Sequence, residues 1–143
     1  MAQASNFLET ELLACLLQST NPAPTVFGGL QTPPNIYVAL TTVAVTDTDT
    51  GSTITEAAYS EYQRVQAGTG RWQLRGGTAG SFENMDLLGF PLAGSGANDT
   101  VIGFALVDAL TAGRVLVYGT CSLSITQGIT PQFQVSSIVI NLD

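Results

Sequence analysis

The apolar positions near the start of the chain follow a helical period. Between residues 6 and 19, one phenylalanine and five leucines recur at steps of three and four residues, which places them on one face of a helix. Ser5 or Asn6 is the expected cap. The prolines of the following segment NPAP end the helix, because proline cannot continue the hydrogen-bond ladder. The pattern predicts one amphipathic helix over residues 5–20.

Most of the remaining apolar positions have the composition and period of β-strands. Residues 35–43 (NIYVALTTV) form a β-branched and aromatic run. Residues 101–108 (VIGFALVD) and 114–120 (RVLVYGT) are two such runs joined by a short turn, which predicts an antiparallel hairpin. Residues 122–126 (SLSIT) alternate strictly, and residues 133–143 read as one final strand.

Polar and glycine-rich stretches separate these runs. Residues 46–53 (TDTDTGST) predict a surface loop, and residues 54–80 predict short strands among loops. One helix and roughly six to eight strands predict a mainly β fold. We expect an antiparallel β-sandwich or barrel, jelly-roll-like, over residues 33–143. A chain of 143 residues has the length of one typical domain, so residues 1–143 are predicted to form a single domain.

The composition indicates a protein that packs against neighbours. Hydrophobic residues make up 45% of the chain and charged residues only 10%, against a usual share of about a quarter. The formal net charge is −7, so we expect no binding to nucleic acid. No apolar run has the length of a membrane span, and the first residues lack the positive charge of a signal peptide. We therefore expect a protein that is soluble at synthesis in a reducing cytoplasm, with Cys15 and Cys121 as buried thiols rather than a disulfide.

The residue types argue against catalysis. The chain has no histidine and no lysine, the usual bases at neutral pH, so we predict no enzyme, no catalytic residue and no cofactor. A pair of carboxylates near the sugar-stacking residue Trp72 is the alternative, since such pairs hydrolyse glycosides. Carboxylates in glycine-rich loops are usually solvated, which favours the first interpretation. The candidate carboxylates are Glu56, Glu61, Glu83 and Asp86.

The acidic loop between Asp47 and Glu56 is a candidate cation site, because hard cations prefer closely spaced oxygen ligands. Its register does not fit a calcium loop, since a third ligand is required where Gly51 stands. We therefore predict an exposed loop and no metal site.

Three of the four arginines lie close together in the sequence. The simpler interpretation is that they balance the chain's own carboxylates. Alternatively, Arg64, Arg71 and Arg75 with Trp72 bind a partner, the arginines through bidentate pairs with its carboxylates. These four residues are the predicted partner-binding set.

Several segments, in a fixed order over nearly the whole chain, carry a family resemblance: NFLE at 6–9, IYVALTT at 36–42, YQRV at 62–65, FP at 90–91, VIGFALVD at 101–108, GRVLVYGT at 113–120, GITP at 128–131 and IVINLD at 138–143. Their order and spacing resemble those of the small virion structural proteins of tailed bacteriophages. These proteins are often labelled tail-fibre-like or minor structural proteins, and they include or resemble capsid cement proteins. Between residues 66 and 88 this chain has more arginine and fewer of the family's expected Trp-Pro and Asn-Gly pairs.

The resemblance implies a virion component with many weak contacts. The leading hypothesis is a homotrimeric capsid cement protein on the outside of the head, bound to the major capsid protein. In such a trimer, the helix and the final strand are expected to pack the apolar faces, and the three arginines to contact the partner. The alternative is a fibre-like or baseplate-associated tail component. Its loops, at 45–55 or 68–80, would contact the host surface, with Tyr59, Tyr62 and Trp72 stacking on polysaccharide.

Overall fold

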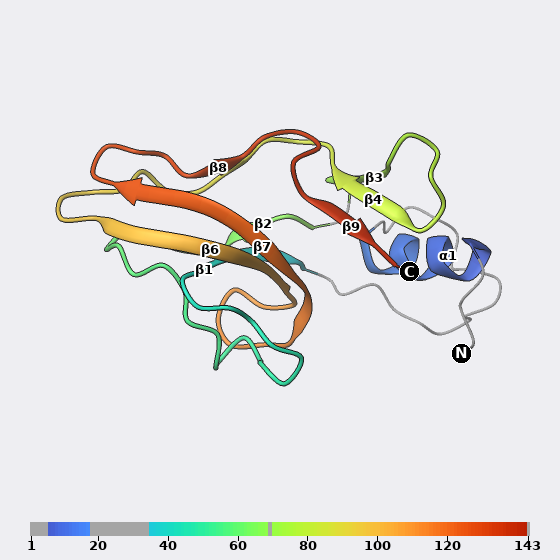
Figure 1. Cartoon of the computed structure of the whole chain (residues 1–143), viewed down its shortest axis with the longest axis horizontal. Coiled ribbons are helices and arrows are strands. Elements are labelled where there is room, and N and C mark those ends of the chain that lie inside the picture. The colour runs from blue at the N-terminus through green and yellow to red at the C-terminus, as the bar shows by residue number, and fades with distance from the viewer. Residues whose placement is uncertain (1–5, 18–34, 69, 143) are drawn as a thin grey trace. The chain divides into compact units, whose positions relative to one another are not determined.

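The computed structural model describes residues 6–17, 35–68 and 70–142, and Figure 1 shows the order of their elements. The chain divides into two compact units. The helix unit contains Met1–Pro34, Gly68–Leu87 and Phe133–Asp143, and the sheet unit contains Asn35–Ala67 and Leu88–Gln132. Each unit is described by itself. That the whole chain unfolds as a single domain stays a prediction.

The predicted helix is present as α1 (Asn6–Leu17). Ser5 and residues 18–20 lie outside the described residues. From Leu12 onward every described side chain of α1 is buried or half-buried, because the segment LLACLL has no polar break. This half of the helix is therefore buried around its circumference rather than along one amphipathic stripe. Cys15 is buried as predicted, and Cys121 is only half-buried. In the described part of the chain, no helix is long and apolar enough to cross a membrane.

The helix unit contains a three-stranded antiparallel sheet in the order β3-β4-β9. Its strands are β3 (Trp72–Leu74), β4 (Ser81–Asn84) and β9 (Val139–Asn141). Trp72 and Phe82 are almost fully buried in its core, and α1 packs against β4. The sequence pattern missed β4, since its segment SFEN does not alternate: all four residues are buried, including Glu83 and Asn84.

The prediction of one continuous final strand over residues 133–143 is wrong. It is interrupted after β8 (Gln132–Phe133), and Ser136 adopts a left-handed conformation with φ of 61° before β9 begins. The fully buried Asn84 stabilises this turn. Its amide nitrogen donates to the carbonyl oxygen of Gln134 (2.7 Å), and its oxygen accepts from the backbone N–H of Ile138 (2.8 Å).

The sheet unit contains a four-stranded antiparallel sheet in the order β2-β1-β6-β7. Its strands are β2 (Val65–Gln66), β1 (Tyr37–Thr41), β6 (Asn98–Val107) and β7 (Val115–Thr126). The predicted hairpin is present as β6 and β7. The alternating segment 122–126 continues β7 rather than forming a separate strand. A two-stranded sheet pairs β5 (Leu88–Gly89) with β8.

Small residues form the centre of one face of the four-stranded sheet. Ala39, Ala105 and Val107 are fully buried there, and Ile54 and Val115 pack against them. Ile54 belongs to the segment after β1, so that segment covers the sheet. The mainly β, antiparallel fold with one N-terminal helix is thus confirmed, with nine strands among the described residues.

Candidate functional site

A cavity of about 480 Å³ opens on the sheet unit, beside the segment that follows β1. The buried guanidinium of Arg64 and the carboxylate of Glu56 both line it. Its lining residues are Gly51, Glu56, Ala57, Tyr62, Gln63, Arg64, Leu110, Thr111 and Ala112.

Arg64 lies directly before β2, and only 6% of its surface is exposed. Its Nε and Nη2 donate to Glu56, with the shortest contact at 2.7 Å between Nη2 and Oε1. The second hydrogen of Nη2 reaches the carbonyl oxygen of Gly51 (2.6 Å). Nη1 donates to the carbonyl oxygens of Ala109 and Ala112, both at 2.8 Å. All five N–H donors of the guanidinium are therefore used inside the chain.

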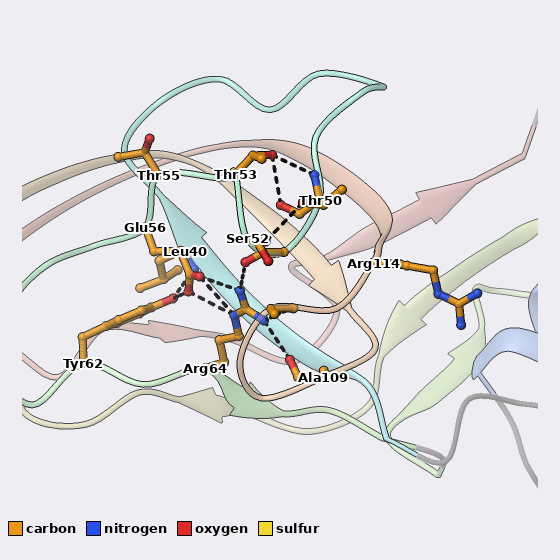
Figure 2. A network of polar contacts seen from close by, with 12 residues as sticks. Leu40, Thr50, Ser52, Thr53, Thr55, Glu56, Tyr62, Arg64, Ala109 and Arg114 are labelled. Carbon is orange, nitrogen blue, oxygen red and sulfur yellow. Dashed lines mark hydrogen bonds and ion pairs between the residues drawn. The ribbon is translucent and has the colours of Figure 1, made fainter.

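Glu56 is also held by the hydroxyl of Tyr62, which donates to Oε2 at 2.6 Å. The same hydroxyl accepts the backbone N–H of Leu40 in β1 (2.9 Å), as Figure 2 shows. Burial, and then the hydrogen bond to Glu56, raise the pKa of Tyr62 well above its usual value, so the hydroxyl stays protonated. We call this arrangement the Arg64 clamp: Arg64, Glu56, Tyr62 and the three carbonyls that Arg64 binds.

The acidic loop 46–55 is fixed to the clamp at Gly51. The N–H of Gly51 donates to the carbonyl oxygen of Gly113 (2.9 Å), while its own carbonyl accepts from Arg64. A Cβ at this position would lie 1.9 Å from the carbonyl oxygen of Ala112, so only glycine fits. The close approach of two backbones explains why position 51 is glycine. The sequence analysis noted only that a calcium loop would need a ligand at this position.

The carboxylates of this loop make contacts within the sheet unit. Asp49 accepts from the backbone N–H and hydroxyl of Thr46 (both 2.8 Å) and from the hydroxyl of Thr53 (2.9 Å). These hydrogen bonds, chiefly the backbone one, lower the pKa of Asp49. Asp47 accepts from the hydroxyl of Tyr118 in β7. Among the described residues, no group of three or more acidic, cysteine or histidine side chains is arranged to hold a metal ion.

The turn between β6 and β7 completes the site from the other side. Asp108 accepts the backbone N–H of Arg114 (2.6 Å) and pairs with its guanidinium (2.7 Å). The backbone hydrogen bond is the main reason that the pKa of Asp108 is lowered. Ala112 adopts a left-handed conformation with φ of 52°, and its carbonyl accepts from Arg64. In Figure 2 the side chain of Arg114 points away from the clamp.

The geometry of the clamp is that of a structural support. Arg64 has no N–H left for a ligand, and each oxygen of Glu56 already accepts two contacts. The clamp connects three segments that are distant in sequence: the loop 46–55, the residues before β2, and the turn 108–114. It holds the exposed parts of both loops on the four-stranded sheet.

The predicted partner-binding residues differ in their exposure. Arg64 and Trp72 are buried, so neither side chain is presented at a surface. Arg71 is exposed. Arg75 is also exposed, and it pairs with Glu83 at 3.5 Å. Binding of a partner by Arg71 and Arg75 stays a prediction.

The aromatic residues expected to stack on polysaccharide differ in their burial. Tyr59 is 6% exposed, and its hydroxyl donates to the carbonyl oxygen of Pro91 (3.0 Å). Tyr62 packs edge-on against Tyr59 and stacks on Phe90, with ring centroids 5.5 Å and 6.3 Å away. Trp72 is also buried, so neither Tyr59 nor Trp72 presents an exposed ring to a sugar. Tyr62 is half-buried and lines the cavity, so stacking of a sugar on its ring stays a prediction.

Two of the other candidate carboxylates, Glu61 and Glu83, also have partners within their own units. Glu61 accepts the backbone N–H of Gly94 (3.0 Å) in the sheet unit. In the helix unit, Glu83 accepts from the amide of Gln73 (2.9 Å) in addition to its ion pair. Asp86 is exposed.

Comparison with known proteins identifies the family. The family described as Podophage GP4 fiber I protein gp80 matches residues 3–141, nearly the whole chain. A search of curated proteins found no match. The predicted resemblance to virion structural proteins of tailed phages is confirmed, and the family's description favours the fibre alternative over capsid cement. The chain belongs to the Podophage GP4 fiber I protein gp80 family of phage virion structural proteins.

Proposed function

We propose that this chain is a structural component of a podophage tail fibre, in place of the capsid cement protein that was the leading sequence hypothesis. The single observation that carries the proposal is the family match over residues 3–141, since the family's description names a fibre protein. The buried clamp supports it, because its polar groups are satisfied within the chain and serve to hold loops in place.

The surface held by the clamp supports a role in contacting the host. In the loop 46–55 most side chains are exposed, and most of these belong to threonine, serine and aspartate. Such side chains donate and accept hydrogen bonds, as polysaccharide hydroxyls do. A loop that is already ordered loses little conformational entropy on binding. We infer that this loop, rather than an aromatic platform, is the surface that meets host polysaccharide.

The location on the virion tests the proposal directly. Tails and tail-less heads are separated from disrupted particles, and an antibody against this chain is applied to each by immunogold microscopy. Labelling of tail fibres is expected, with the major capsid protein as the marker of heads. Tail-less heads that retain the chain would reject the fibre assignment and restore the cement hypothesis.

The loop is tested separately by competition. Purified chain should reduce adsorption of phage to host cells. The double variant Ser52→Arg with Thr55→Arg changes two exposed positions of the loop and should compete less well. Gln127→Arg with Thr130→Arg adds the same charge at exposed positions of another turn in the same unit and should compete like the wild type. Equal competition by both variants would reject the loop as the host-facing surface.

A further inference from the structure

A second, smaller cavity of about 170 Å³ lies in the sheet unit, where the segment that leads from β1 into the loop 46–55 meets β6 and β7. It shares no lining residue with the cavity at the Arg64 clamp. Aliphatic side chains and glycine form most of its lining, with one tyrosine and one threonine. The lining residues that matter below are Ala44, Val45, Ile102, Gly103, Tyr118 and Thr120.

The strand register places this cavity on the covered face of the four-stranded sheet. Gly103 is paired with Thr41 of β1 on one side and with Thr120 of β7 on the other, and directly opposite residues share a face. Tyr118 is paired with Ala105, which belongs to the face that the segment after β1 covers. Over these pairs the register is regular, and the bulges between β6 and β7 lie outside them. Thr41 and Gly103 therefore lie on the same side of the sheet as the cavity.

The hydroxyl of Thr41 is an unusual feature of this face. Thr41 is fully buried, and among the described residues no atom forms a hydrogen bond with its Oγ1. A Cβ at position 103 would lie 2.8 Å from this oxygen and 2.8 Å from the carbonyl oxygen of Gly119. Glycine thus leaves a space between two polar atoms, at a residue that lines the cavity. An unpaired buried hydroxyl destabilises a fold, so its presence here needs an explanation.

We propose that this cavity, which we call the Thr41 pocket, binds the acetamido group of an N-acetylated sugar in the host polysaccharide. An acetamido group combines a methyl group with an amide N–H and a carbonyl oxygen. The aliphatic lining accommodates the methyl group. The amide reaches the Thr41 hydroxyl through the space at Gly103, and that hydroxyl can both donate and accept a hydrogen bond. The inference rests on the proposed contact with polysaccharide and names the class of sugar.

The lining of the Thr41 pocket disfavours other small groups. The methyl group of a deoxy sugar would fill the aliphatic part but leave the Thr41 hydroxyl unpaired. The hydroxyl of an unmodified sugar could pair with Thr41 but would gain nothing from the aliphatic part. A carboxylate or phosphate would be buried without a counter-charge, because no described arginine lines the pocket and the chain has a net charge of −7.

The rim of the Thr41 pocket can hold the rest of the sugar. Ala44, Tyr118 and Thr120 are exposed there, so a ligand can enter from solvent. The hydroxyl of Tyr118 donates to Asp47, which fixes the aromatic side chain at the rim. The loop 46–55 begins directly after Val45. A sugar whose acetamido group occupies the pocket would therefore also meet the loop that we proposed as the host-facing surface.

Titration of the purified full chain with monosaccharides, followed by NMR, tests the class of ligand. At least one of N-acetylglucosamine and N-acetylgalactosamine should shift the backbone resonances of Gly103 and Thr120. It should bind about tenfold more tightly than glucose or galactose, because it adds one buried methyl group and one hydrogen bond. Glucosamine, which keeps the nitrogen but lacks the acetyl group, should bind no better than glucose.

The variant Thr41→Val separates binding from folding. Valine has nearly the shape of threonine without the unpaired hydroxyl, so the variant should unfold at a higher denaturant concentration than the wild type. Its affinity for the acetylated sugar should nevertheless fall about tenfold. Ala44→Phe, at an exposed position, should fill the pocket and abolish binding. The matched control Ala58→Phe changes an exposed alanine of the same unit that does not line the pocket, and it should bind like the wild type.

Three outcomes would overturn the proposal: equal affinity for acetylated and parent sugars, no binding of either acetylated sugar, or a Thr41→Val variant that binds as tightly as the wild type. These outcomes are distinguishable from a failure of the proposed function. If the wild-type chain still competes with phage for host cells, the contact with polysaccharide stands and only the acetamido pocket is rejected. Immunogold labelling confined to heads would instead reject the fibre assignment itself.

Discussion

Replacing Arg64 should destabilise the sheet unit more than any other arginine substitution in the chain. The side chain of Arg64 is 4% exposed and that of Glu56 is 20% exposed. Removing one partner of a buried ion pair costs about 3–5 kcal/mol, because the other charge stays buried and uncompensated. The carbonyls of Gly51, Ala109 and Ala112 would also lose their donor, although loops can turn a carbonyl to water. We expect Arg64→Met to lower the free energy of unfolding by about 3–5 kcal/mol.

The substitution Arg64→Lys distinguishes the contribution of the positive charge from that of the planar guanidinium. Arg64→Lys keeps the positive charge but offers three donors instead of five, without the planar fork that spans Glu56 and the carbonyls. We expect it to lose roughly half as much stability as Arg64→Met, or about 2 kcal/mol. The double variant Arg64→Met with Glu56→Gln contains neither charge of the pair, so no unpaired charge is left buried. Its loss of unfolding free energy should be smaller than the sum of the two single losses by about 1–3 kcal/mol.

The assay is denaturant unfolding followed by far-UV circular dichroism, with hydrogen exchange at the loop 46–55. Arg114→Met is the matched control, because the side chain of Arg114 is 81% exposed and its pair with Asp108 should contribute no more than about 1 kcal/mol. The reasoning fails if Arg64→Met costs as little as Arg114→Met. It also fails if Arg64→Lys is as stable as the wild type, since the fork geometry would then be irrelevant.

Three further predictions concern other features of the two units. Gly51→Ala should destabilise the sheet unit by roughly 1–3 kcal/mol or more, because its Cβ would overlap the backbone of the neighbouring turn, while Ser52→Ala next to it should be neutral in the same unfolding assay. Burial raises the pKa of Tyr62 above its usual 10.0, so its contribution to stability is complete below about pH 10 and is lost as the pH rises further; unfolding titrations at pH 8 to 11 should show a steeper alkaline loss in the wild type than in Tyr62→Phe, and equal slopes would contradict this. If residues 1–143 form a single domain, the fluorescence of Trp72, the only tryptophan, should change at the same denaturant concentration as hydrogen exchange in β6, and two separate transitions would reject the single domain.

The elements with strong local signals could be predicted from the sequence. The hairpin of β6 and β7, strand β1, the loop 46–53 and the start of α1 all lie where the apolar period or the turn residues place them. In these segments local propensity and burial agree. The family resemblance was also available from the order of such segments.

Elements without a local signal could not be predicted. The strand β4 is buried on both faces and includes Glu83 and Asn84, so its pattern is neither alternating nor apolar. The break before β9 depends on the side chain of Asn84, which is about fifty residues away in sequence from the turn that it stabilises. The burial of Tyr59 likewise depends on neighbours supplied by the fold.

The role of Arg64 shows most clearly what the tertiary structure decided. In the sequence, Arg64 stands within eleven residues of Arg71 and Arg75, a spacing that predicts one basic group. In the structure, its partners lie 8, 13, 45 and 48 residues away, and they meet only when β1, β2 and the β6–β7 turn are assembled. The sequence by itself determined strand β1, the β6–β7 hairpin, the low charge and the absence of histidine and lysine, because these follow from residue types and short periods. Which charged groups are buried, and against what, depends on long-range contacts that a local pattern does not contain.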